Sequence, residues 1–401
     1  MMDAYLYGGL RTPVGRYGGA LSSVRPDDLL AGVLNRLVAD SPFRPEDFED
    51  VIVGCTSQAG EDARNVARHA SLVAGLPVGL GAQTVNRLCG SGLAAVADAA
   101  RCANTAQGEL FLAGGVESMS RAPFVMAKSE TAFARKPKVY EALGERFPNP
   151  VVHAMFGRDS MPQTGDNVAA EHGIARDEAD RFALASQQKY EKGAAEGFFD
   201  REIAPVTVKG RKGAETVVDR DEHPRPGSTI EGLAKLPTLF EGGVVTAGNA
   251  SGVNDGAAAL IVGTRAAGEK AGAAPLARIV TAAVAGVEPR VMGLGPVPAT
   301  RKALDRAGLS LADIDVIELN EAFASQALAC MKLLDLAQDD SRVNPYGGAI
   351  AVGHPLGMSG ARIALTAARQ LAAGHGRYAL VTMCIGLGQG IAMILERTDA
   401  H

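Results

Sequence analysis

Short apolar runs alternate with helix-like patterns along the first 122 residues. Apolar positions recur at helical spacing in residues 27–39 and again in residues 65–72. Compact apolar runs at residues 50–55 and 109–115 have the length and composition of buried strands. This alternation of strands and helices predicts a layered α/β fold.

The last third of the chain repeats this order of elements. Residues 311–317 resemble the stretch that leads into the 50–55 run. A glycine-rich turn then precedes a helical pattern at residues 359–373, and an apolar run at residues 378–384 corresponds to the strand predicted at 109–115. A repeated order of elements predicts two related halves within one fold.

Between the two halves, the sequence is more polar and less regular in its pattern of apolar positions. Residues 124–150 are charged and irregular, residues 177–196 predict a polar helix with one apolar face, and residues 209–213 are typical of a hairpin tip. We therefore expect an inserted loop domain that covers a site. The predicted division is residues 1–122 plus 249–270, residues 123–248, and residues 271–401.

Composition excludes several classes of function. The 401 residues are 47% hydrophobic and 21% charged, which is typical of a globular protein, and the net charge of -5 gives no reason to expect nucleic acid as a partner. No apolar run reaches the roughly 18 residues that span a bilayer, and the N-terminal residues lack the pattern of a secretory leader. We therefore expect a cytoplasmic protein without nucleic-acid or membrane partners.

The five cysteines are widely spaced and form no Cys-x-x-Cys pair. This spacing predicts neither a disulfide framework nor a metal site, and it fits a reducing compartment. Their chemistry therefore has to be judged one by one.

Cys89 stands out because it lies in a glycine turn, Asn86-Arg87-Leu88-Cys89-Gly90-Ser91-Gly92, directly before an apolar helical run. At a helix N-terminus, free amide groups and the helix dipole favour a thiolate, which makes a cysteine nucleophilic. The two glycines would let a substrate approach the sulfur closely. The alternative is a buried structural cysteine, a common fate of this residue type.

Three further stretches combine glycine with a polar group. Asn320 follows a buried strand, where polar groups line the binding crevice of an α/β sheet, although asparagine is also a favoured helix cap. His354 lies between Gly353 and Pro355, ahead of a helix, in a setting suited to a base or hydrogen-bond donor. Cys384 ends a buried strand and precedes Gly386 in a turn that leaves amides free. Together these groups indicate covalent acyl chemistry with a separate proton carrier.

The chain resembles the thiolase family, of the acetyl-CoA acyltransferase type, over nearly its whole length. The matching stretches, in the family's order, are residues 86–92, 248–252, 320–323, 347–362 and 384–390. The resemblance implies two related βαβαβαββ halves that form a layered α-β-α-β-α core with an inserted loop domain. It also implies reversible thiolytic cleavage of a 3-ketoacyl-CoA by coenzyme A, or the Claisen condensation that reverses it.

The resemblance further implies a role for each site residue. Cys89 would become acylated while His354 takes up its proton, and Cys384 would exchange a proton with the reacting carbon. One oxyanion hole would consist of His354 and a water held by Asn320, and the other of the amides of Cys89 and Gly386. Such a donor contributes on the order of a hundredfold to a thousandfold in rate.

The resemblance also implies where the substrates bind. Positions that match the family's coenzyme A contacts and its acyl and pantetheine tunnel are Arg225, Phe240, Ala247, Ser251, Met161, Met292, Ala322 and Phe323. Coenzyme A is a substrate, and no metal or bound cofactor is expected. Residues 124–150 correspond to the family's tetramerisation region, which predicts a homotetramer.

One departure bears on the acyl group. Many short-chain members carry a histidine before the methionine that matches Met161, whereas this chain has Ser160. The variant resembles the thiolases that cleave β-ketoadipyl-CoA in aromatic degradation. A distal carboxylate would need a nearby cation, for which Arg158, His153 and Arg146 are candidates, unless each is simply a solvated surface residue.

Four other interpretations remain open from the sequence. Gly90-Ser91-Gly92-Leu93-Ala94-Ala95 fits a nucleotide-binding fingerprint, but the acidic residue at the required spacing, Glu109, begins its strand instead of ending it. A ketoacyl synthase would share the fold but have a second histidine in place of Cys384. The others are a general acetoacetyl-CoA thiolase and a non-catalytic acyl-CoA or lipid-binding relative.

Overall fold

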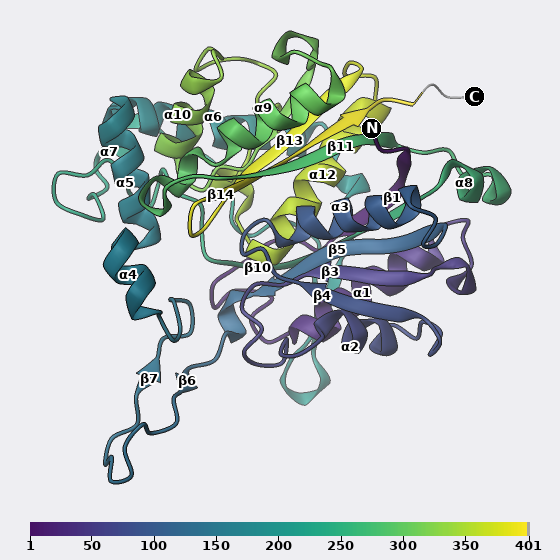
Figure 1. The fold of residues 1–401 in the computed structure, drawn as a ribbon, viewed down its shortest axis with the longest axis horizontal. Coiled ribbons are helices and arrows are strands. Elements are labelled where there is room, and N and C mark those ends of the chain that lie inside the picture. Colours follow the sequence, from purple (N-terminus) through teal and green to yellow (C-terminus); the bar gives the residue numbers. More distant parts are fainter. Residues whose placement is uncertain (399–401) are drawn as a thin grey trace.

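The computed structural model describes residues 1–398, and one mixed sheet runs through both halves of this part of the chain (Figure 1). The strand order is β4-β3-β5-β10-β1-β11-β14-β13-β12. The two halves join where β1 pairs antiparallel with β11 over only three residue pairs, Ala4 with Ile279 to Leu6 with Ala277.

The elements of the N-terminal half are β1 Ala4–Arg11, β2 Gly15–Arg16, α1 Pro26–Ala39, β3 Asp50–Gly54, α2 Val66–Val73, β4 Gly81–Val85, α3 Ser91–Asn104, β5 Leu110–Ser118 and β10 Asn254–Gly263. In this half, α1, β3, α2, α3 and β5 follow the order that the sequence predicts, and β1, β2 and β4 were not predicted. The elements of the C-terminal half are β11 Ala277–Gly286, α9 Pro296–Ala307, β12 Val316–Leu319, α10 Ala324–Leu333, α11 Ala349–Val352, α12 Leu356–Ala372, β13 Tyr378–Ile385 and β14 Gln389–Glu396. Helix α8, Arg265–Ala271, connects the halves.

The two halves have the same topology. In the first half β3 is parallel to β4 and β5, and β10 is antiparallel to β5 and β1. In the second half β12 is parallel to β13 and β14 is antiparallel to β13 and β11, while a parallel bridge from Ile317 to Val343 takes the place of the β3–β4 pair. The predicted internal repeat is therefore confirmed.

Helices α3 and α12 form the central layer between the two parts of the sheet (Figure 1), and most residues of both helices are buried. Their backbones approach so closely that glycine is required. A Cβ added at Gly92 would lie 2.5 Å from the Gly357 carbonyl oxygen, and one at Gly360 would lie 2.3 Å from the Leu93 amide nitrogen. The predicted helix at residues 359–373 in fact begins three residues earlier, at Leu356.

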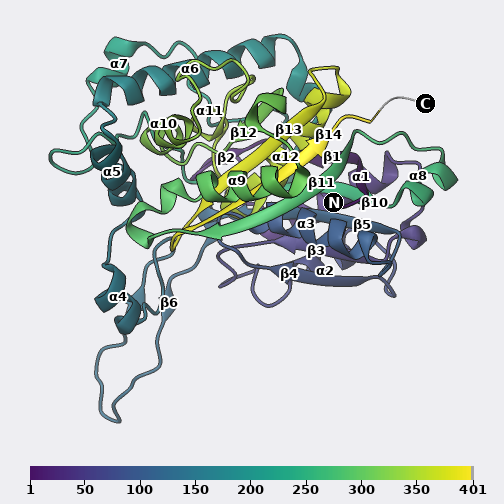
Figure 2. The ribbon, with the colours of Figure 1, turned by 45° about the horizontal axis from the view of Figure 1, so that its top comes forward.

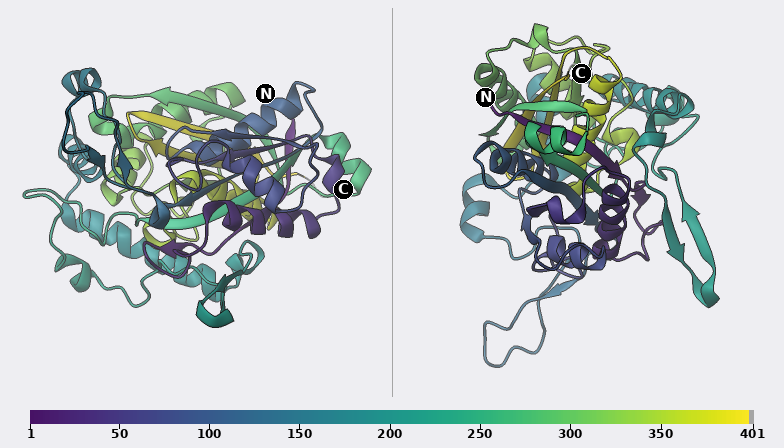
Figure 3. Two further views of the ribbon diagram at one scale, coloured as in Figure 1. Left: turned by 90° about the horizontal axis from the view of Figure 1, so that it is seen from below. Right: turned by 90° about the vertical axis from the view of Figure 1, so that its right-hand side faces the viewer.

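The region between the halves contains α5 Met161–His172, α6 Arg176–Ala195 and α7 Ile230–Ala234, which gather on one side of the core (Figure 2). Its remaining elements are β6 Val125–Met126, β7 Val139–Tyr140, α4 Pro150–Phe156, β8 Val206–Lys209 and β9 Glu215–Val218. The predicted polar helix is α6, and the predicted hairpin tip joins β8 to β9 in a hairpin that stands away from the body (Figure 3).

The exact domain boundaries stay a prediction, and residues 399–401 of the third predicted unit lie outside the described residues. Among residues 1–398, we find no helix with both the length and the apolar character needed to cross a membrane.

Candidate active site

The turn that carries Cys89 lies between β4 and α3. Leu88 has a φ of 47°, a left-handed conformation that is strained for leucine and common at functional sites. Hydrogen bonds hold it there, because the Leu88 amide donates to Asn86 Oδ1 at 2.9 Å and Ser91 Oγ donates to the Leu88 carbonyl at 2.6 Å. The turn therefore presents Cys89 directly before the first turn of α3, as the sequence predicts.

Groups from the C-terminal half face the Cys89 sulfur. The backbone amides of Gly386 and of Cys89 itself lower the pKa of the thiol, because both are placed to stabilise a negative charge on the sulfur. Gly386 follows the last residue of β13, Ile385, whose side chain packs closely on Gly90. The structure therefore brings together the two amides that the resemblance predicts as an oxyanion hole.

His354 is held from both sides. Its backbone amide donates to Asn254 Oδ1 at 2.9 Å, and its Nδ1 lies 2.7 Å from Ser359 Oγ. Ser359 Oγ in turn donates its one hydrogen to the Pro355 carbonyl at 2.8 Å. Nδ1 must then be the donor toward Ser359, which leaves the lone pair of the neutral imidazole on Nε2, ready to accept a proton.

Asn320 lies at the carboxyl end of β12, next to this free nitrogen. Its Nδ2 is 3.5 Å from His354 Nε2, while its Oδ1 is buried without a hydrogen-bond partner. Helix α10 begins only at Ala324, with Phe323 as its N-cap residue. The alternative that Asn320 caps a helix is therefore wrong, and its side chain is free to act in the site.

Cys384 is 1% exposed and belongs to a small apolar cluster. The cluster members are Val245, Met292, Ala322, Phe323 and Cys384. Met161 lies close to Gly386. A Cβ atom added at Gly386 would be 3.9 Å from Met161 Sδ, and it would be 3.3 Å from Leu88 Cδ1. The structure thus gathers Met292, Ala322 and Phe323 around Cys384, and Met161 beside Gly386.

In the resting site Cys89 is a neutral thiol and His354 is a neutral imidazole. Burial raises the pKa of the Cys89 thiol to about 11, although the Gly386 and Cys89 amides partly oppose that shift. Burial, with a smaller effect of Arg362, lowers the pKa of His354 to about 3. The expectation that the free amides and the helix dipole favour a thiolate is wrong, because burial of the Cys89 thiol outweighs them, and the resting pair is a thiol and a neutral imidazole.

The thiol of Cys384 is also held in its neutral form. Burial raises its pKa well above the usual range, and a negative charge on Cys89 would raise it further. A neutral Cys384 has a proton to give, and it would resist ionisation while Cys89 is charged.

Of the predicted coenzyme A contacts, three lie on the inserted region and Ser251 lies just after it. The Ser251 amide donates to the Ala322 carbonyl at 3.0 Å, and Ala250 forms an antiparallel bridge with Phe323, so this strand-like contact joins Ser251 to the acyl cluster. Arg225, Phe240 and Ala247 are exposed. Their part in binding coenzyme A stays a prediction.

Three residues that position the site were not predicted from the sequence, namely Ser359, Asn254 and Glu117. The Glu117 carboxylate accepts amide hydrogens from Thr56 and Ser57 at 3.0 Å and from Gly357 at 2.9 Å, and so links the two halves beside the site. Ser359, five residues after His354, could have been inferred from the chain. Asn254 and Glu117 could not, because only the folded sheet places them.

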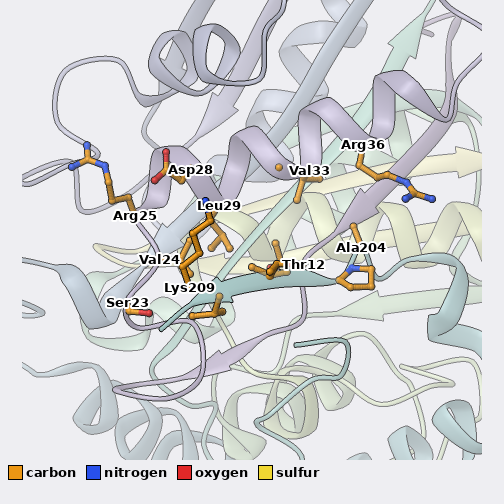
Figure 4. A pocket seen from close by; sticks show the side chains of 15 residues that line it. Thr12, Ser23, Val24, Arg25, Asp28, Leu29, Val33, Arg36, Ala204 and Lys209 are labelled. Atoms are coloured by element: carbon orange, nitrogen blue, oxygen red, sulfur yellow. The ribbon is translucent and has the colours of Figure 1, made fainter. Parts of the chain in front are cut away.

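Two other features are candidate sites, a cavity and a cluster of possible metal ligands. A cavity of about 520 Å³ between α1 and β8 is lined by Thr12, Arg25, Asp28 and Lys209 among others, and by none of the predicted site residues (Figure 4). Cys55, Asp62 and Glu117 approach within 4.8 Å in the described part of the chain. Because the Glu117 carboxylate is already engaged by three amides, this cluster fits a structural role better than a metal site.

Comparison with protein families decides between the interpretations. The family model for the N-terminal domain of thiolase matches residues 5–266, and that for the C-terminal domain matches residues 273–397. This chain belongs to the thiolase family. It is an acyltransferase that catalyses thiolytic cleavage, and the oxidoreductase, ketoacyl synthase and non-catalytic alternatives are set aside.

Individual relatives cover the whole length of this thiolase. It is 57% identical over 99% of its length to the whole 3-oxoadipyl-CoA/3-oxo-5,6-dehydrosuberyl-CoA thiolase of Escherichia coli, and 54% identical over the same share to the whole β-ketoadipyl-CoA thiolase of Acinetobacter baylyi. Among solved structures, an acetyl-CoA acetyltransferase of Bacillus anthracis matches with a TM-score of 0.93 and 37% identity over 99% of both chains. The predicted thiolase fold is confirmed.

Proposed function

We propose that this thiolase cleaves β-ketoadipyl-CoA with coenzyme A to give succinyl-CoA and acetyl-CoA. The observation that carries the proposal is the identity of 57% and 54%, over full length, with thiolases named for this substrate. Ser160, in the position where many short-chain members have histidine, supports the same subtype.

The first half of the reaction forms the acyl-enzyme. The Cys89 sulfur attacks the C3 carbonyl of the substrate while its proton passes to His354 Nε2. The C2–C3 bond then breaks, its electron pair stays on C2 of the departing acetyl-CoA, and Cys384 supplies the proton that C2 needs. The succinyl group remains on Cys89 as a thioester.

The second half returns the enzyme to its resting state. The thiol of coenzyme A gives up its proton, restoring the one that Cys384 donated, and its sulfur attacks the succinyl thioester. Cys89 leaves and regains its proton from His354. We propose that the amides of Cys89 and Gly386 stabilise the oxyanion of one intermediate, and His354 with Asn320 that of the other. No step requires a metal or a resident cofactor.

The test of the substrate is thiolysis by the purified protein. We expect kcat/KM for β-ketoadipyl-CoA to exceed that for acetoacetyl-CoA at least tenfold, which corresponds to about 1.4 kcal/mol of transition-state discrimination. Both rates are measured by the appearance of acetyl-CoA at matched substrate concentrations. Equal rates, or a preference for acetoacetyl-CoA, would instead identify a general short-chain thiolase.

We also propose that residues 124–150 mediate assembly into a homotetramer. This arm, which contains β6 and β7, projects from the body (Figure 1) and exposes large apolar side chains that it cannot bury by itself. The most exposed of them are Phe124, Met126 and Phe133, the last at 92%. Analytical ultracentrifugation is expected to show a tetramer, and a dimer or monomer at micromolar concentration would contradict the proposal. A cytoplasmic location stays a prediction.

A further inference from the structure

We propose that Arg146 is the specificity residue that binds the distal carboxylate of the acyl group. The inference rests on the proposed function and adds to it the group that would bind the carboxylate of the substrate, the Arg146 guanidinium. Arg146 lies at the base of the arm, in the segment that leads to α4.

The guanidinium of Arg146 is anchored but incompletely satisfied. Its Nη2 donates to the Ser57 carbonyl at 2.9 Å, whereas its Nη1 is buried without any hydrogen-bond partner. Among residues 1–398, the hydrogen bond to the Ser57 carbonyl is the one polar contact that the guanidinium makes, and no ion pair accompanies it. A buried, charged donor without a partner is costly and uncommon, and a bound anion would satisfy it.

The anchor point, Ser57, is linked by hydrogen bonds of its neighbour Thr56 to the turn that carries Cys89. Ser57 is held by Glu117, and its neighbour Thr56 contacts the nucleophile turn in two places. Thr56 Oγ1 donates to the Leu88 carbonyl at 3.0 Å, and Asn86 Nδ2 donates to the Thr56 carbonyl at 3.0 Å. The position of Arg146 is therefore set by the same contacts that set the turn of Cys89.

The other two candidate cations are less suited to this role. His153 Nε2 lies 2.6 Å from Glu145 Oε2, so the imidazole already pairs with a carboxylate of the chain. Arg158 is exposed on the stretch before Met161, where water solvates its charge and reduces its value as a selective contact. Arg146 alone of the three combines a fixed position with an unpaired buried nitrogen.

The substrate chemistry matches this arrangement. In succinyl-Cys89 only two methylene groups separate the thioester carbonyl from the carboxylate, which places the carboxylate about 5 Å from the sulfur at bond lengths near 1.5 Å. A guanidinium binds a carboxylate through one or two charge-assisted hydrogen bonds. An acyl group that ends in methyl would leave the Nη1 hydrogens of Arg146 unpaired.

The experiment compares two substrates of equal chain length, β-ketoadipyl-CoA and 3-oxohexanoyl-CoA, which differ in the terminal carboxylate. We expect Arg146→Met to lower kcat/KM for β-ketoadipyl-CoA on the order of 10- to 100-fold while that for 3-oxohexanoyl-CoA changes less than about threefold. Arg146→Lys should restore part of the loss. Arg158→Met is the matched control and should leave the ratio of the two values unchanged.

The outcomes separate this inference from the proposed function. A wild-type enzyme that prefers β-ketoadipyl-CoA, together with an Arg146→Met variant that keeps the preference, would overturn the inference alone. Equal losses on both substrates would also overturn it, because they would show that Arg146 only supports the Ser57 segment. A wild-type enzyme without the preference would overturn the proposed function and the inference together.

Discussion

Cys89→Ala is expected to lower thiolytic turnover by at least about 10⁴-fold and to abolish the acyl-enzyme, because the variant has no atom that can hold the acyl group. The fold should persist, since Cys89 is only half-buried and lies outside both β4 and α3. Mass spectrometry of the protein after mixing with acetyl-CoA measures the acyl-enzyme directly, and circular dichroism checks the fold.

The matched control for this variant is Cys102→Ala, another half-buried cysteine in the last turns of α3. It should acylate and turn over like the wild type. Acylation of a different cysteine in the Cys89→Ala protein would reject Cys89 as the nucleophile. In the free wild-type enzyme, alkylation of Cys89 by iodoacetamide should still rise with pH above 9, because only the thiolate reacts and its pKa is about 11.

Cys384→Ala should separate the two halves of the reaction. Acetyl-CoA should still acylate Cys89, because Cys89, His354 and the Gly386 amide are unchanged. Carbon–carbon cleavage of a 3-ketoacyl-CoA should fall on the order of 10³-fold, since general acid and base catalysis by one side chain contributes typically 10²- to 10⁴-fold.

Two measurements check this prediction for Cys384. Rapid quenching and mass spectrometry follow acylation by acetyl-CoA, and deuterium exchange into the methyl group of acetyl-CoA follows proton transfer at carbon. Cys330→Ala, which removes a buried thiol bonded to the Gly293 carbonyl, is the control and should retain exchange. Normal cleavage by Cys384→Ala would rule out its role as proton carrier.

The sequence predicts the parts of this site that depend on local backbone. Cys89 and His354 lie beside glycines in short turns, and Cys384 lies in the strand just before the glycine turn that begins at Gly386; such turns can be recognised from a few consecutive residues. The same is true of the repeated order of strands and helices, because each element carries its own periodicity.

The parts that depend on distant segments could not be predicted. Asn254 and Glu117 look like ordinary strand residues, and only the pairing of β10 with β5 brings both beside the His354 turn. The pKa of Cys89 also depends on burial under groups from the other half, which a local argument about a helix dipole does not include.

The close packing of α3 on α12 has a consequence for how activity is acquired. The nucleophile precedes one helix and the base precedes the other, so neither half of the chain contains a working centre. Activity should therefore return during refolding only after the two duplicated halves have docked, later than the recovery of secondary structure. Catalysis in this enzyme therefore reports that the two halves of the chain have docked.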